Sequence, residues 1–519
     1  MPVHEVPLKR KGEPLPAEEG KVFFCPKCMT RFDTKEDMDI HENLCLIKDK
    51  NYRIINLPDQ RMYLEPSITD LKKCAPINAW MTADFECVLQ PKDKQKCKTH
   101  IVSKHVPCSF SVCLNTNFEG ASKFTIYTGT SAQDTAEKFC ETILNFSKDY
   151  YEFVTSRREP MIPLTPEELQ QFETATNCCY CGREFSAETQ GMMKVADHDH
   201  VSGKYLGASC SNCNIMRVPS RQAIPLFFHN GRNYDMHLFL REITKKKYGC
   251  TFEGIAQNSQ KFMSLTISKS VDTEYTDSKG KNKKASQKVM CDIKVLDSIL
   301  FMLAGLETLT TNLKEKNKDA SAAQIFPTTF QTFQALFGAD EAMVELALQK
   351  NLYPYLWFNS FDKFDMPIEE LKKLFDEDKY EFFTDNVNDA FIERFQRLKP
   401  IFYQVVEAYG CKIVKDYANI YLAMDTCQLM DILNNARQVY YDVHGLDMYQ
   451  FMGMPGYTWA AYQIHLMNHP VYDIAGRNAK PWLFMQGEMN MIGSLQRPSV
   501  VVVLVLCSGT LVRITSSIQ

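Results

Sequence analysis

The distribution of apolar positions after residue 74 predicts strands followed by a helix. Apolar residues dominate segments 77–86, 105–113 and 124–127, and each segment has the length of a strand. Segment 134–154 instead has apolar residues three or four positions apart, which indicates an amphipathic helix. Further strands are predicted near 223–229 and 288–296. Segment 391–433 again has helical spacing.

This order of elements predicts an α/β domain. Three strands followed by a helix, with more strands later in the chain, suit a ribonuclease-H-like fold with a mixed sheet. With 519 residues, of which 45% are hydrophobic, the chain can bury a sizeable core and form two to four domains.

Carboxylates stand at the ends of several predicted elements. Asp84 and Glu86 follow a buried strand, and the strand period of two places them on one face. Asp235 comes where a strand ends and a helix begins, and Asp425 lies four residues after Tyr421 on one helix face. Clustered carboxylates bind pairs of hard divalent cations, and such pairs catalyse the hydrolysis of phosphodiesters by water. The sequence therefore predicts a two-metal nuclease that uses two Mg²⁺ or Mn²⁺ ions.

The succession of these motifs resembles that of a known family. Ala83-Asp84-Phe85-Glu86, Asn230-Gly-Arg-Asn-Tyr234-Asp235 and Tyr421-Leu-Ala-Met-Asp425 resemble the Exo I, Exo II and Exo III motifs of the 3′-to-5′ proofreading exonuclease in family B DNA polymerases. The neighbouring segments Phe228-His229-Asn230, Asp297-Ser298, Lys350-Asn-Leu-Tyr353-Pro-Tyr355 and Asp416-Tyr417-Ala-Asn-Ile-Tyr421 are similar to the protein-primed branch from organelles, viruses and transposons. The resemblance covers roughly residues 74 to 492.

This resemblance implies roles for individual residues. The metal ligands would be Asp84, Glu86, Asp235 and Asp425. Tyr421 would orient the attacking water, and Lys350 would neutralise charge on the scissile phosphate. The single-stranded 3′ end would be held by His229, Asn230 and Ser298. A helix N-cap before Phe301 is the alternative for Ser298, and Ile299 stands where relatives have leucine.

A short cysteine-containing segment near the N-terminus predicts a zinc finger. The pattern Cys-x2-Cys-x12-His-x3-Cys is formed by Cys25, Cys28, His41 and Cys45. Thiolate and imidazole ligands at this spacing close a tetrahedral zinc site in a small ββα unit. Acidic side chains on its predicted helix would repel phosphate. We therefore expect this finger to contact protein or to serve as an anchor.

An insertion between the first two carboxylate motifs predicts a second structural zinc. Two Cys-x2-Cys pairs, 28 residues apart, supply Cys178, Cys181, Cys210 and Cys213. The insertion is similar to phage recombination endonucleases of the ββα-metal class. That resemblance implies a nuclease metal ligand at Asp197, a general base at His198 and a second ligand at Asn214. The alternative is a decayed unit whose zinc only supports the fold, and Tyr205-Leu206 replaces the expected Tyr-Arg.

The motifs divide the chain into predicted parts. These are a disordered segment 1–20, a zinc finger 21–48, an exonuclease domain 74–435 that contains the zinc unit 170–217, a bridge 436–492 towards a polymerase palm, and an atypical tail 493–519. The apolar run Val500–Leu506 is too short to span a bilayer and predicts a strand. Palm motifs are absent from the sequence, and we interpret the change near residue 493 as a truncation or frame change. We expect the chain not to extend a primer.

Charge and cysteine content agree with an intracellular enzyme that acts on nucleic acid. Nineteen cysteines and a polar N-terminal segment favour reduced thiols and metal sites over a secreted disulfide framework. The net charge of −4 does not itself indicate a DNA-binding protein. The lysine-rich stretch 279–288 is predicted to be a solvated loop between strands, with contact to a DNA backbone as the alternative. A nuclear location and no membrane association are expected.

Two functions from different classes remain open at this point. The first is the exonuclease-bearing part of a protein-primed, family B DNA-directed DNA polymerase in DNA replication. Its partners would be single-stranded and primer–template DNA and a terminal protein. The second is a non-catalytic, zinc-rich DNA-binding relic of a transposon or viral polymerase. A third possibility, that the inserted unit carries the activity, would require His198 to matter more than Asp84.

Overall fold

The structure is a computed structural model in which two compact units are distinguished. It describes residues 6–7, 21–24, 31–32, 34–44, 75–96, 99–157, 159–258, 261–276, 282–349, 351–468, 471–472, 478–479, 502–507 and 510–515. One unit comprises Met1–Leu64 and His469–Gln519, and the other comprises Glu65–Asn468.

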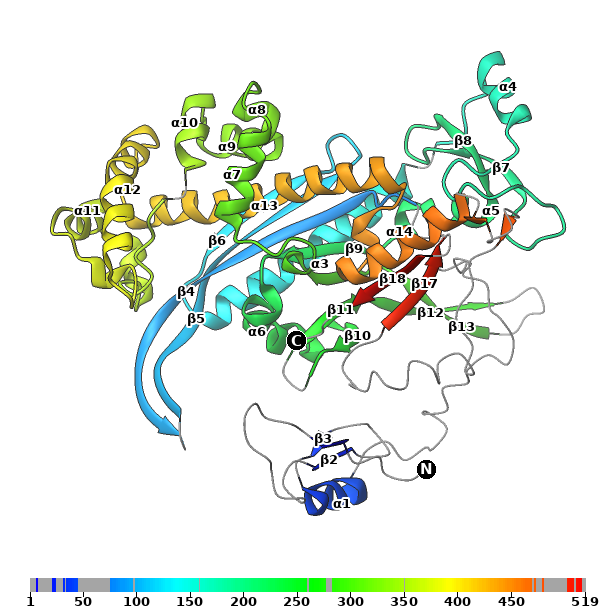
Figure 1. Ribbon diagram of the computed structural model, residues 1–519. Coiled ribbons are helices and arrows are strands. Elements are labelled where there is room, and N and C mark those ends of the chain that lie inside the picture. Colours follow the sequence, from blue (N-terminus) through cyan, green and yellow to red (C-terminus); the bar gives the residue numbers. More distant parts are fainter. Residues whose placement is uncertain are drawn as a thin grey trace. The chain divides into compact units, whose positions relative to one another are not determined.

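A mixed seven-stranded sheet forms the centre of the larger unit (Figure 1). Its strands, in spatial order, are β10 (Thr251–Ala256), β11 (Phe262–Ser268), β14 (Ile293–Asp297), β9 (Ile224–Phe228), β4 (Ala79–Lys96), β5 (Thr99–Thr116) and β6 (Lys123–Thr128). The pairs β14–β9 and β9–β4 are parallel, and the other neighbours are antiparallel. The chain therefore has a mixed α/β fold, and each of the five segments predicted as strands between residues 77 and 296 contributes a strand to this sheet.

The two faces of the sheet are covered by different helices. Alternation along β4 directs Phe85 into a cluster with residues of α3 (Ala132–Ser156) and α6 (Asp235–Ile243). Trp80 lies instead in the cluster that includes α13 (Val414–His444). Asp84 and Glu86 are an even number of positions from Trp80 along β4, so they lie on the same face of the sheet as Trp80. The side chains that carry the predicted chemistry are thus on the α13 face of the sheet.

A group of helices joins the last strand of the sheet to α13. They are α7 (Leu306–Lys316), α8 (Ala322–Ile325), α9 (Pro327–Phe337), α10 (Glu341–Ala347), α11 (Ile368–Asp376) and α12 (Asp389–Ala408). The helical segment predicted over 391–433 is therefore two helices, α12 and α13. Gly410, with φ of 60°, lies between them in the left-handed region that glycine adopts without strain and other residues avoid.

The prediction of a solvated loop over 279–288 is wrong for residues 282–288. These residues form β13 (Asn282–Lys288), which pairs along its whole length with β12 (Ser270–Thr276). Backbone hydrogen bonds between β12 and β13 stabilise this antiparallel pair, although lysine and asparagine have low strand propensity.

The inserted unit contains α4 (Pro166–Thr174), the antiparallel pair β7 (Lys194–His198) and β8 (Tyr205–Cys210), and α5 (Ser211–Arg217). Short 3-10 turns complete the larger unit: η3 (Pro219–Arg221), η4 (Gly231–Asn233), η5 (Lys246–Tyr248), η6 (Ser298–Leu300), η7 (Phe361–Asp365), η8 (Tyr380–Phe382) and η9 (Met448–Gln450). Helix α14 (Met454–Asn468) follows η9.

The smaller unit has its own short elements. These are β1 (Val6–Pro7), β2 (Lys21–Phe24), β3 (Arg31–Phe32), α1 (Lys35–Leu44), β15 (Val471–Tyr472), β16 (Asn478–Ala479), β17 (Val502–Cys507) and β18 (Thr510–Thr515). Strand β1 lies inside the segment 1–20 that was predicted to be disordered, and it pairs with β2. Strand β17 is formed by the apolar run that predicted a strand. Within the described residues of both units, no helix is long and apolar enough to cross a membrane.

Candidate active site

A cavity of about 490 Å³ collects the four predicted carboxylates. Asp84, Glu86, Asp235 and Asp425 all line it. Polar and aromatic side chains complete the wall, and these are His105, His229, Asn230, Tyr234 and Tyr355. Asp84 and Asp425, which are 341 positions apart in the sequence, thus line the same cavity.

Three elements position these carboxylates. Strand β4 carries Asp84 and Glu86, α6 begins at Asp235, and α13 carries Asp425. Hydrogen bonds fix α13 against the sheet beside the cavity. The Thr82 hydroxyl donates to the Thr426 carbonyl at 3.0 Å, and the Ser111 hydroxyl donates to the Leu422 carbonyl at 3.2 Å. Both acceptors lie within one helical turn of Asp425, so these bonds hold its backbone in place.

Burial raises the pKa of two of these carboxylates, Asp84 and Asp235. Burial raises the pKa of Asp84 well above its ordinary value, and the charges of the three neighbouring carboxylates raise it further. Burial raises the pKa of Asp235 to about 7. Asp235 Oδ1 is buried and has no hydrogen-bond partner among the described residues. A buried carboxylate oxygen without a donor is costly, and a cation removes that cost.

The carboxylates are less tightly grouped than the cysteines described below. Among the described residues, the four cysteine thiols lie within 4.8 Å of one another, close enough to share one metal ion. The four carboxylates do not form a group as close as this one. The four carboxylates share one cavity, and the charges of the other three raise the pKa of Asp84.

Tyr421 lies next to the cavity on the same helix as Asp425. Its hydroxyl is 2.9 Å from the hydroxyl of Tyr355, which lines the cavity. Burial, followed by the neighbouring Tyr355 and Asp425, raises the pKa of Tyr421 well above its ordinary value. Its hydroxyl is therefore protonated at neutral pH. Lys350, the predicted phosphate-neutralising residue, lies outside the described residues.

The loop that precedes Asp235 has a restricted backbone. Asn230 has φ of 69°, and Gly231 packs so closely that a Cβ there would lie 2.4 Å from Phe228 Cβ. The buried Asp297 accepts hydrogen bonds from the amides of Asn230 at 2.8 Å and Arg232 at 3.2 Å. Asp297 therefore holds the loop from which α6 begins.

Ser298 lies beneath the cavity wall. It is fully buried, its hydroxyl donates to the Phe228 carbonyl at 3.0 Å, and it is 2.9 Å from His229 Nδ1. The predicted alternative, that Ser298 is a helix N-cap, is wrong because Asp297 caps the 3-10 turn η6 and accepts from the Ile299 amide. Of the three residues predicted to hold a 3′ end, His229 and Asn230 line the cavity.

Sequence reasoning missed the roles of Asp297 and His105. Asp297 ends β14, which runs parallel to β9, so its place beside the loop after β9 could have been inferred from the parallel pairing. His105 Nδ1 is 2.8 Å from the Tyr234 hydroxyl. No local pattern marks His105, because its position depends on the register of the β4–β5 pair.

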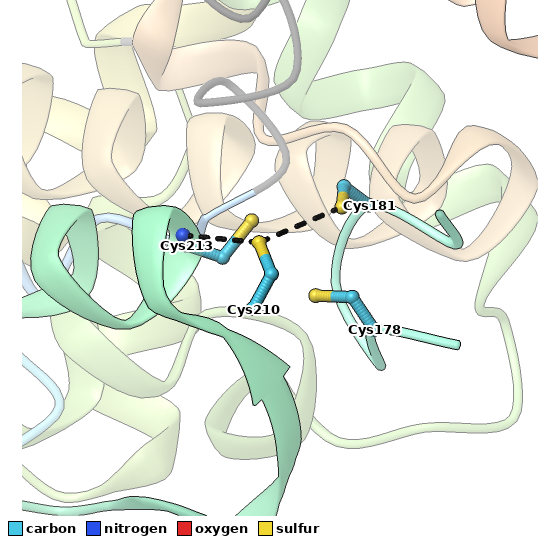
Figure 2. A group of neighbouring side chains, drawn as sticks. All are labelled: Cys178, Cys181, Cys210 and Cys213. Carbon is cyan, nitrogen blue, oxygen red and sulfur yellow. Dashed lines mark hydrogen bonds between the residues drawn. The ribbon is translucent and has the colours of Figure 1, made fainter. Parts of the chain in front are cut away.

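The four cysteines of the insertion converge as predicted (Figure 2). Cys178, Cys181, Cys210 and Cys213 are buried, and their sulfurs lie within 4.8 Å of one another. Hydrogen bonds from neighbouring thiols, Cys179 first and then Cys181, lower the pKa of Cys178. This cluster could hold a metal ion, because metals bind the thiolate form of cysteine. For the N-terminal finger, Cys25, Cys28 and Cys45 lie outside the described residues, and the ring of His41 in α1 lies 4.8 Å from the Phe32 ring in a tilted arrangement.

The second predicted nuclease site has a different environment. Asp197 Oδ2 accepts a hydrogen bond from the Tyr180 hydroxyl at 2.7 Å and pairs with Arg217 at 3.3 Å. The His198 ring lies 4.6 Å from that of His200. Asn214 Oδ1 is buried with no hydrogen-bond partner among the described residues. The carboxylate of this trio is thus neutralised by the protein itself, in contrast to Asp235.

Comparison of the chain with protein-family models, with curated proteins and with solved structures found no match.

Proposed function

We propose that this chain is a divalent-cation-dependent 3′-to-5′ exonuclease that acts on single-stranded DNA ends. The observation that carries the proposal is that four carboxylates from β4, α6 and α13 line one cavity. Two-metal hydrolysis of phosphodiesters needs such a set of oxygen ligands on a rigid scaffold.

The arrangement of the sheet supports this proposal. Two parallel pairings, β14–β9 and β9–β4, join antiparallel strands on both sides. This order is compatible with a ribonuclease-H-like fold. Asp84 and Glu86 lie on a central strand of such a sheet, where their backbone pairs with Ser111 and Ser109 of β5.

The carboxylates fit hard divalent cations such as Mg²⁺ or Mn²⁺. Asp84, Glu86, Asp235 and Asp425 would hold them, and the orphaned Asp235 Oδ1 supports this assignment. When bound, such cations lower the pKa of water and stabilise charge on the leaving oxygen.

The chain's own residues would position the reacting groups. The neutral Tyr421 hydroxyl, linked to Tyr355, would orient the attacking water. His229 and Asn230 would contact the terminal nucleotide from the cavity wall, with Ser298 holding the His229 ring. Lys350 would neutralise charge on the scissile phosphate, as the resemblance to the polymerase family implies.

We further propose that the chain is the exonuclease-bearing part of a protein-primed, family B DNA polymerase in DNA replication. The order of the three Exo-like motifs and their convergence on one cavity support this assignment. The metal of the four-cysteine cluster would be a structural zinc, because four thiolates leave no open coordination position for chemistry.

The proposal is tested with a 5′-fluorescent single-stranded oligonucleotide incubated with the wild-type chain and Mg²⁺. We expect a ladder that shortens with time, no reaction in EDTA, and no reaction when the 3′ end carries an inverted nucleotide. Internal cleavage of the end-blocked oligonucleotide would instead favour an endonuclease. An unchanged oligonucleotide with both Mg²⁺ and Mn²⁺ would reject the proposal.

A further inference from the structure

The two longest strands of the sheet extend well past their other neighbours. Strand β6 pairs with β5 only over Ser109–Leu114, and β9 pairs with β4 only at Met81 and Thr82. Beyond Glu86, β4 and β5 pair with each other, up to Lys96 opposite Thr99. We name residues 87–96 and 99–107 the arm, and Figure 1 shows it within the two long blue strands β4 and β5. From Cys87 to Lys96 the arm spans about 30 Å.

The base of the arm forms part of the candidate active site. Cys87, Leu89 and His105 line the same cavity as the carboxylates. The His105 ring contacts Tyr234, the residue before Asp235, through the 2.8 Å hydrogen bond. A bulge between Glu86 and Cys87 separates the metal-binding part of β4 from the arm. The arm thus begins where the predicted metal ligands end.

The arm has the opposite charge to the cavity. Residues 91–96 and 99–105 contain four lysines and one aspartate, a net charge of +3 with histidine neutral, whereas the whole chain has a net charge of −4. The lysines are Lys92, Lys94, Lys96 and Lys104. A cavity of carboxylates repels a polyanion except where cations are bound. A basic ribbon at its edge supplies the long-range attraction that a nucleic acid needs.

We propose that the arm binds the sugar–phosphate backbone of the DNA strand whose 3′ end enters the cavity. This inference rests on the proposed exonuclease function. It adds the path of the DNA strand outside the cavity. The length of the arm matches several nucleotides. Its lysines would act through charge and would be indifferent to base sequence.

The test compares two triple variants that remove the same charge. The arm variant is K94Q/K96Q/K104Q. The matched control is K372Q/K373Q/K379Q, at and just after α11, where these lysines pair with Glu369, Glu370 and Glu377. Binding of a single-stranded oligonucleotide of about 20 nucleotides is measured by fluorescence anisotropy in Ca²⁺ at several salt concentrations. Hydrolysis of the p-nitrophenyl ester of thymidine 5′-phosphate, which fits the cavity without needing the lysines of the arm, is measured in Mn²⁺.

We expect the arm variant to bind the oligonucleotide on the order of tenfold more weakly. The slope of log affinity against log salt concentration should be smaller in magnitude by up to about 2. Its hydrolysis of the small ester should equal that of the wild-type chain, and the control should match the wild type in both assays. Wild-type affinity in the arm variant would overturn the inference, and so would equal weakening in the control. A larger loss of affinity in the arm variant for a blunt duplex than for the single strand would also overturn it. Failure of the wild type to hydrolyse the ester would count against the proposed function, while the anisotropy result would still decide the inference.

Discussion

At the scale of single residues, the backbone before Asp235 depends on side-chain choice. Asn230 has φ of 69°, a conformation that asparagine tolerates and β-branched residues do not. We expect Asn230→Val to lower the free energy of unfolding by about 1–2 kcal/mol relative to Asn230→Gly. Urea unfolding followed by circular dichroism measures this difference. Equal stability of the two variants would show that the loop does not hold this conformation.

The buried carboxylates predict an unusual pH dependence of stability. Asp235 has a folded pKa of about 7, above that of an unfolded aspartate. A raised pKa gives stability that is complete below about pH 4 and is lost as the pH rises to 7, up to about 4 kcal/mol for metal-free protein. Because Asp235 must deprotonate to bind a cation, Mg²⁺ should raise the melting temperature more at pH 8 than at pH 5.

The control for this prediction is Asp235→Asn, which removes the titrating group. Melting temperatures in EDTA should fall less between pH 4 and pH 7 in this variant than in the wild-type chain. Identical pH profiles for the two proteins would contradict the assigned burial of Asp235.

Residue-level chemistry was predictable where it followed a local period. The strand period placed Asp84 and Glu86 on one face, and both line the cavity. Asp297 and Ser298 differ because their hydrogen bonds reach residues 65 to 70 positions away. Those contacts depend on the parallel pairing of β14 with β9, which no local pattern contains.

At the scale of elements, the inserted unit depends on its cysteines. Its core contains the four thiols, one buried methionine and two partly buried aromatic side chains, which is too little to fold a unit of this size by apolar burial alone. We expect about two zinc ions per chain in total, one of them bound here. Cys210→Ser should lower the zinc content to about one, as measured by elemental analysis.

The same variant separates the inserted unit from the exonuclease site. Cys210→Ser should retain hydrolysis of the small thymidine ester, since its carboxylate cavity is built from β4, α6 and α13. A zinc content near zero in wild-type protein purified without chelators would contradict the metal assignment. An unchanged content in the variant would remove Cys210 from the ligand set.

Elements with a strong hydrophobic period were predicted well, and those set by pairing were not. Helix α3 and strands β6 and β9 match their predicted ranges closely. Strand β4 extends ten residues beyond Glu86, because the lysine-rich continuation has a partner in β5 and no apolar period. Strand β13 was missed for the same reason.

At the scale of the whole molecule, the site exists because the sheet brings distant segments together. Helix α13 crosses the face of the sheet that carries Asp84 and Glu86, and hydrogen bonds from Thr82 and Ser111 hold it there. The α/β class followed from the order of predicted strands and helices. The presence of a basic arm beside an acidic cavity could not be predicted in this way, because the net charge of the whole chain sums over both regions.

The most direct test of the central claim compares three variants on a 5′-fluorescent single-stranded oligonucleotide with Mg²⁺ or Mn²⁺. Asp84→Ala and Asp425→Ala should each slow shortening from the 3′ end on the order of a hundredfold to a thousandfold, because each removes a carboxylate that would hold a cation. Circular dichroism should show that both variants remain folded. His198→Ala should leave the rate unchanged, since His198 belongs to the inserted unit. Loss of the ladder in the His198 variant, with its retention in the Asp84 variant, would contradict the assignment of the chemistry to this cavity.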